Sequence, residues 1–153
     1  MRSHRITIGI TIALLSFGWI GFHSVAHAQP ESVKSAREAV LSSIEALETL
    51  KSDTLIDPIE RLDRETDLKR QALTNIIELS ILETDIIRDK VVALRVEARF
   101  TTLQEKISKD LKGYLEYFKA TENVLEQTAD LNGIQRIAGQ LKDWRGLAYD
   151  PGV

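Results

Sequence analysis

From residue 31 onward, apolar positions recur every three or four residues, which is the spacing of one face of an α-helix. The first such stretch predicts a helix from Ser32 to Lys51, with an apolar stripe made of Val33, Ala36, Val40, Ile44, Leu47 and Leu50. Gly and Pro are absent between residues 31 and 56 and again between 59 and 112, so the chain lacks the strongest helix breakers over long spans.

A second helix is predicted to begin at the Asp57-Pro58-Ile59-Glu60 sequence. Asp57 suits the N-cap, Pro58 suits the first helical position, and Glu60 is spaced to reach back to the cap. If this helix ran unbroken to Arg99 it would be about 63 Å long, twice the length of the first helix. We therefore expect a break, either at Thr84-Asp85 or before Thr101 and Thr102, which can act as caps.

The stretch from Ala72 to Leu82 is apolar around most of the helix circumference, and Glu78 is its one charged residue. A helix that is apolar all round is covered by neighbours. The stretch is therefore either the centre of a bundle or a surface that another subunit covers. On the second interpretation, the predicted partner interface consists of Leu73, Ile76, Ile77, Leu79, Ile81 and Leu82.

Two further helices are predicted, from Leu103 to Gln127 and from Ile134 to Leu147, with a turn at 130–133 between them. Phe118 and Trp144 lie on apolar stripes and are expected in the core, whereas Tyr117 is expected to be the exposed aromatic residue. The fold class is thus all-α: an elongated antiparallel bundle, or coiled-coil-like helices, of four to five segments. No motif identifies a family.

Residues 1–28 resemble a signal peptide, with Arg2 and Arg5 before an uncharged, mostly apolar run at 6–22. Ala26 and Ala28 are small residues at the positions a signal peptidase requires, so cleavage would leave Gln29 as the new N-terminus. The alternative is that residues 6–28 stay as a membrane anchor, because the 25 residues from 6 to 30 contain no Asp, Glu, Lys or Arg and are long enough to span a bilayer. Both interpretations place the rest of the chain outside the cytoplasm, either periplasmic or secreted.

Residues 29–153 are predicted to form a single helical domain. Asp150-Pro151 repeats the helix-start chemistry of Asp57-Pro58, yet the sequence ends at Val153. This pattern suggests that the chain is truncated at its C-terminus.

Composition narrows the chemistry that residues 29–153 can perform. All three His residues and the one Met lie in the first 28 residues, and the chain has no Cys. Triads and dyads that need His or Cys are therefore excluded, and we expect no catalytic residue, cofactor or metal ligand. Residues 29–153 carry 23 acids and 18 bases, a net charge of −5, which disfavours nucleic-acid binding.

These observations predict an exported, non-catalytic helical protein that has a structural role or binds a protein partner or a second copy. The alternative is a membrane-anchored sensor or small-ligand-binding bundle. In either case the membrane would be contacted only through an uncleaved N-terminal segment.

Overall fold

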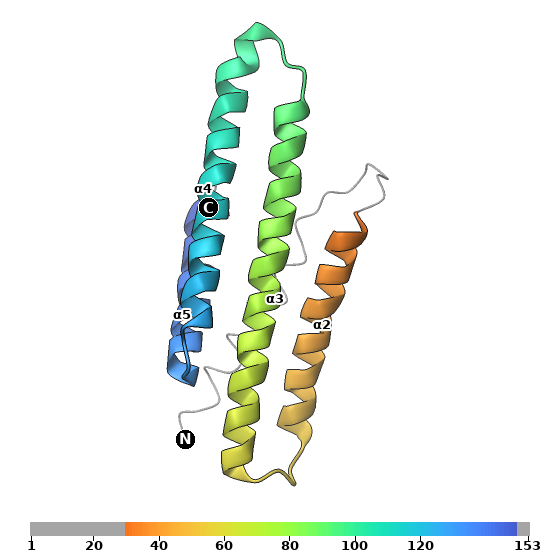
Figure 1. The fold of residues 1–153 in the computed structure, drawn as a ribbon, viewed down its shortest axis with the longest axis vertical. Helices are drawn as coiled ribbons and strands as arrows, with labels where there is room; N and C mark the ends of the chain where they lie inside the picture. Colours follow the sequence, from red (N-terminus) through yellow and green to blue (C-terminus); the bar gives the residue numbers. More distant parts are fainter. Residues whose placement is uncertain (1–29, 150–153) are drawn as a thin grey trace.

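A computed structural model describes residues 30–149 and contains four α-helices and no strand in that range. The helices are α2 (Glu31–Ser52), α3 (Pro58–Ala93), α4 (Thr101–Glu126) and α5 (Leu131–Tyr149), and a short 3-10 helix, η2 (Ala98–Phe100), precedes α4. Consecutive helices run antiparallel, and the longest, α3, lies between α2 and α4 (Figure 1). The predicted all-α bundle is confirmed.

The core lies along one part of α3 and is built from all four helices. Ile77 is fully buried, and Phe118 of α4 and Ile134 of α5 are each 2% exposed. The other buried members of this cluster are Val33, Val40, Ile44, Leu73, Ile76, Leu79, Leu125, Ile137 and Leu141. Burial of these side chains is the main favourable contribution to the free energy of folding.

The predicted start of the second helix is confirmed. Asp57 is the N-cap of α3, Pro58 is its first residue, and the Asp57 carboxylate accepts hydrogen bonds from the backbone N–H groups of Ile59 and Glu60. Glu60 does not complete the expected reciprocal cap. Its carboxylate instead pairs with Arg64 one turn later, at 2.6 Å.

The predicted break at Thr84-Asp85 is wrong. The hydroxyl of Thr84 is buried within α3 and donates to the carbonyl oxygen of Ser80 at 2.6 Å, so the side chain is satisfied without ending the helix. The break comes instead after Ala93. Helix α4 then begins at Thr101 with Phe100 at the N-cap and no side-chain capping bond, so Thr101 and Thr102 are not the caps.

The last helix begins earlier than the sequence predicted. Asp130 accepts a hydrogen bond from the backbone N–H of Gly133 at 2.8 Å, so the predicted turn at 130–133 contains the first residues of α5. Any Cβ at position 133 would lie 2.5 Å from the Thr128 methyl group. Glycine is therefore required where the α4–α5 connection packs against the start of α5.

The aromatic residues join α4 to α5. Trp144 stacks on Tyr117, with ring centroids 4.3 Å apart, and meets the edges of Tyr114 and Phe118 at 5.2 and 5.3 Å. Phe118 and Trp144 thus pack in or against the core as expected, but Tyr117 is only partly exposed because Trp144 covers it.

Candidate interaction surface

The hairpin of α3 and α4 extends beyond the helices that flank it. In Figure 1 the N-terminal end of α2 and the C-terminal end of α5 both lie below the connection between α3 and α4. Between Thr84 on α3 and Leu111 on α4 no residue is buried. About five turns of helix therefore extend beyond the last buried residues, roughly 14 Å of α3 and 15 Å of α4.

We call residues 90–104 the hairpin tip; they comprise the last turn of α3, the connection and the first turn of α4. The tip exposes five large apolar side chains. Their exposed fractions are Val92 63%, Leu94 59%, Leu103 54%, Phe100 44% and Val96 37%. An exposed apolar cluster on a protein surface is typical of a site of interaction with another molecule.

Hydrogen bonds from a side chain to the backbone, rather than buried apolar side chains, hold the two sides of the tip together. The side-chain amide of Gln104 donates to the carbonyl oxygens of Val91 at 2.6 Å and Leu94 at 2.9 Å. These carbonyls belong to the end of α3, where helical partners run out. Gln104 on α4 therefore holds the end of α3 in place, and the apolar side chains between them are presented on a defined backbone.

The tip is basic. It holds Lys90, Arg95 and Arg99 against one acid, Glu97, a net charge of +2. Arg99 pairs with Glu97 at 2.9 Å, and its guanidinium carbon lies 4.7 Å from the centroid of the Phe100 ring. Within residues 30–149, Lys90 and Arg95 form no salt bridge, so their charges are available to a partner.

One turn below the tip, Arg88 does not add to this available charge. Its guanidinium contacts the carboxylates of Asp85 and Asp89, each at 2.9 Å. The hydrogen bond to Asp89, followed by the charges of both acids, raises the pKa of Arg88 above its ordinary value. The charge of Arg88 is therefore offset by its two neighbouring carboxylates, and Lys90 and Arg95 remain the basic side chains at this end of the hairpin that form no salt bridge within residues 30–149.

The connection between α2 and α3, residues 49–61, lies at the opposite end of the molecule (Figure 1). It exposes Leu55 and Ile59, at 94% and 75%. Its two bases and three acids give a net charge of −1. The connection between α4 and α5 lies further along α3, where Arg70 donates hydrogen bonds to the carbonyl oxygens of Thr128 and Ala129.

The belt that the sequence predicted as a partner interface lies elsewhere. Leu73, Ile76, Ile77 and Leu79 are buried, and Ile81 and Leu82 are partly buried against the same core. Of the two locations left open by the sequence, the structure places the belt at the centre of the bundle. Contacts with α2, α4 and α5 occupy its surface, so little of it remains for a partner.

The sequence did not single out the tip, because several of its apolar residues continue helical stripes. Val91, Leu94 and Ala98 keep helical spacing past the end of α3, and Leu103 begins the stripe of the next predicted helix, so periodicity gave no sign that Leu94 and Leu103 are exposed.

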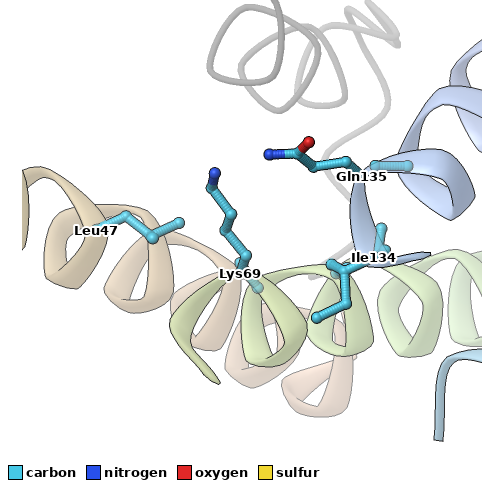
Figure 2. Close-up of a pocket in the computed structure, with 7 residues that line it drawn as sticks. Leu47, Lys69, Ile134 and Gln135 are labelled. Atoms are coloured by element: carbon cyan, nitrogen blue, oxygen red, sulfur yellow. The ribbon is translucent and has the colours of Figure 1, made fainter. Parts of the chain in front are cut away.

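A small recess lies between α2, α3 and α5, lined in part by Leu47, Lys69, Ile134 and Gln135 (Figure 2). Lys69 and Gln135 extend toward one another on one side of it, from α3 and α5. The Lys69 ammonium is nearly buried and pairs with Glu65 at 2.5 Å. The recess measures about 30 Å³, which is close to the volume of one water molecule.

Among residues 30–149 no three acidic, His or Cys side chains are grouped closely enough to hold a metal ion. No helix in that range combines the length and the apolar composition that crossing a membrane requires. The predicted cleavage residues Ala26, Ala28 and Gln29, and the Asp150-Pro151 pair, lie outside the described residues.

Comparison with protein-family models, with curated proteins and with solved structures finds no match for this chain.

Proposed function

We propose that the chain is an exported, non-catalytic helical protein that acts by binding another protein through the hairpin tip. One observation carries the proposal: the tip holds five exposed apolar side chains on a backbone that Gln104 fixes, at the end of a hairpin that no other helix within residues 30–149 covers. Solvent exposure of such a cluster is unfavourable unless a partner covers it.

Composition supports the non-catalytic part of the proposal. Export and cleavage after Ala28 would remove every His and the Met, and the chain has no Cys, so residues 29–153 lack imidazole and thiol groups. Catalysis in residues 29–153 would therefore depend on carboxylate, hydroxyl, phenol or amine groups alone.

A small-ligand-binding or sensor role is the alternative, and the recess between α2, α3 and α5 is its candidate site. At about 30 Å³ the recess is far smaller than the several hundred Å³ of an ordinary ligand pocket. The hairpin tip is therefore the surface that the geometry favours.

Site-specific photo-crosslinking tests the proposal. A photoreactive amino acid replaces Phe100, which is 44% exposed at the tip, and in a matched variant it replaces Leu41, which is 56% exposed on α2. In the native host we expect protein adducts from position 100 and few from position 41. Equal labelling from both positions, or none from position 100, would contradict the proposal.

A further inference from the structure

The uncovered part of α3 begins where α2 begins. The side-chain amide of Asn75 on α3 donates to the carbonyl oxygen of Ala39 on α2 at 3.1 Å, so these two residues lie side by side. Because the two helices are antiparallel and rise by the same distance per residue, the nine residues from Ala39 back to Pro30 bring the start of α2 level with Thr84 (Figure 1). Thr84 is the last buried residue of α3, so the cover that α2 gives to α3 ends there.

The face of α3 that packs against α2 continues into the hairpin tip. Asn75 and Glu83 both contact α2, the latter through an ion pair with Arg37 at 2.6 Å. Helical spacing carries the same face from Glu83 through Ile86 to Leu94. Exposure rises along this row, from Ile86, which is partly buried, to Leu94, which is 59% exposed. A chain segment that extended α2 toward its N-terminus would run along this face and meet the tip.

The residues that precede α2 have the length and the composition to cover the tip. Thr84 and Leu94 are about 15 Å apart along α3, and an extended chain covers that distance in about five residues. Residues 22–29, which lie outside the described residues, include Phe22 and Val25 and contain no Asp, Glu, Lys or Arg. Contact between this segment and the tip would bury apolar surface without burying a carboxylate, ammonium or guanidinium group of the segment.

Covalent connection gives this segment an advantage over any separate molecule. A short linker holds the groups at its two ends at an effective concentration on the order of millimolar. Residues 22–29 are joined directly to α2, and the first turn of α2 is fixed in the core by Val33, which is 4% exposed. A separate protein would have to exceed that effective concentration, or bind the tip more tightly, to displace the segment.

We infer that residues 22–29 cover the hairpin tip in the uncleaved chain, so that removal of residues 1–28 exposes the tip to its protein partner. This inference rests on the proposed function and supplies its regulation. Cleavage after Ala28 leaves only Gln29 and Pro30 before α2, which together span about 7 Å and cannot reach Leu94. The uncleaved chain therefore binds its partner weakly, and the processed chain binds it fully.

Substitutions at the cleavage site control whether the segment is retained. Ala26→Gln/Ala28→Gln removes the small residues that a signal peptidase requires, and Ala26→Ser/Ala28→Ser is the control that keeps these positions small. Intact mass shows whether residues 1–28 are present in each. A photoreactive amino acid in place of Leu94 reports what covers the tip. The same group in place of Leu55, which is 94% exposed at the opposite end of the molecule, is the positional control.

In the Gln variant we expect adducts between position 94 and residues 22–29, located by peptide mass spectrometry, and at least tenfold less partner adduct than in the Ser variant. Position 55 should give no adduct with residues 22–29. Adding Val25→Asp to the Gln variant should restore the partner adduct several-fold, because a carboxylate in the covering segment opposes its burial. That restoration separates cover of the tip from a change in the location of the retained chain.

Three results would overturn the inference. Partner adducts from position 94 that are as abundant in the Gln variant as in the Ser variant would mean that the retained segment leaves the tip exposed, and the proposed function would stand. Lipid adducts from position 94, with none to residues 22–29, would place a bilayer at the tip instead of the segment. A Ser variant that retains residues 1–28 would remove the processing step.

The proposed function has a separate outcome in the same experiment. Adducts with residues 22–29 in the Gln variant, together with no partner adduct in the Ser variant, would support the cover and contradict the binding of a protein partner at the tip.

Discussion

Leu79 and Leu94 are the same amino acid fifteen positions apart, yet their environments differ. Leu79 is 8% exposed in the core, whereas Leu94 is 59% exposed at the tip. The difference arises because Leu79 belongs to the core cluster that α3 forms with α2, α4 and α5, whereas Leu94 lies outside that cluster. At the scale of residues, burial thus depends on position along α3 rather than on side-chain type.

Leu79→Asp tests this assignment. An unpaired carboxylate at a buried position loses its hydration, so we expect a loss of about 3 kcal/mol or more in the free energy of unfolding. Leu41→Asp, at a position 56% exposed, is the control and should cost less than about 1 kcal/mol. Urea denaturation measures both, and equal losses would show that position 79 is not in the core.

Glu122 predicts a pH dependence. Partial burial, followed by the nearby charges of Glu78 and Glu126, raises the pKa of Glu122, and the charge of Lys119 only partly offsets this. The ionised form is therefore disfavoured in the folded state, so this group favours folding at low pH. That contribution is lost as the pH rises through the raised pKa.

Glu122→Gln removes the unfavourable ionisation. We expect a gain in the free energy of unfolding of at most about 0.5 kcal/mol at pH 7, and no gain at about pH 3, where both forms are neutral. Glu105→Gln, on an exposed part of α4, is the matched control and should have little effect at either pH. A gain that persisted unchanged at low pH would rule out ionisation as its cause.

At the scale of elements, hydrogen bonds at helix ends decide where each helix starts and stops. Asp57 begins α3, Asp130 precedes α5, and Gln104 satisfies the carbonyls where α3 ends. Thr84 shows the opposite case, because a hydroxyl that bonds within its own helix leaves that helix intact. A residue type that favours caps therefore marks a helix boundary only where its side chain bonds to a free backbone group at the helix end and not to a carbonyl within the same helix.

Asp57→Ala should destabilise the protein by about 1 kcal/mol, because two backbone N–H groups at the start of α3 lose their acceptor. Asp63→Ala, two turns further along α3, is the control. Its carboxylate is exposed and has no hydrogen bond or salt bridge within residues 30–149. Thermal or urea denaturation should separate the two variants, and indistinguishable stabilities would contradict the capping role.

At the scale of the whole molecule, the protein is a rod whose core occupies only part of its length. Helices α2 and α5 pack on α3 and α4 over the lower part of the hairpin, and neither of these two helices reaches its upper part (Figure 1). The buried apolar side chains that stabilise the fold therefore lie toward one end of the hairpin. The exposed apolar side chains of the tip lie at the other end, where a partner can reach them.

Because α5 packs on the same core as α2 and α3, the described helices should unfold together. Trp144 is the one Trp in residues 29–153, so its fluorescence reports on α5 in a chain that begins at Gln29. We expect the Trp144 signal and the helical circular dichroism signal to change at the same urea concentration. Loss of the Trp144 signal before the helical signal would show that α5 detaches independently.

The sequence by itself determined that the chain is helical, where α3 begins and which chemistry residues 29–153 lack. These properties depend on neighbours within a few positions, such as the Asp57-Pro58 pair, or on composition alone. Only the tertiary structure decided that the belt at Leu73–Leu82 packs in or against the core and that no other described helix covers residues 90–104. Periodicity identifies the apolar face of a helix, but the lengths and placement of the other helices decide how far along that face the cover extends.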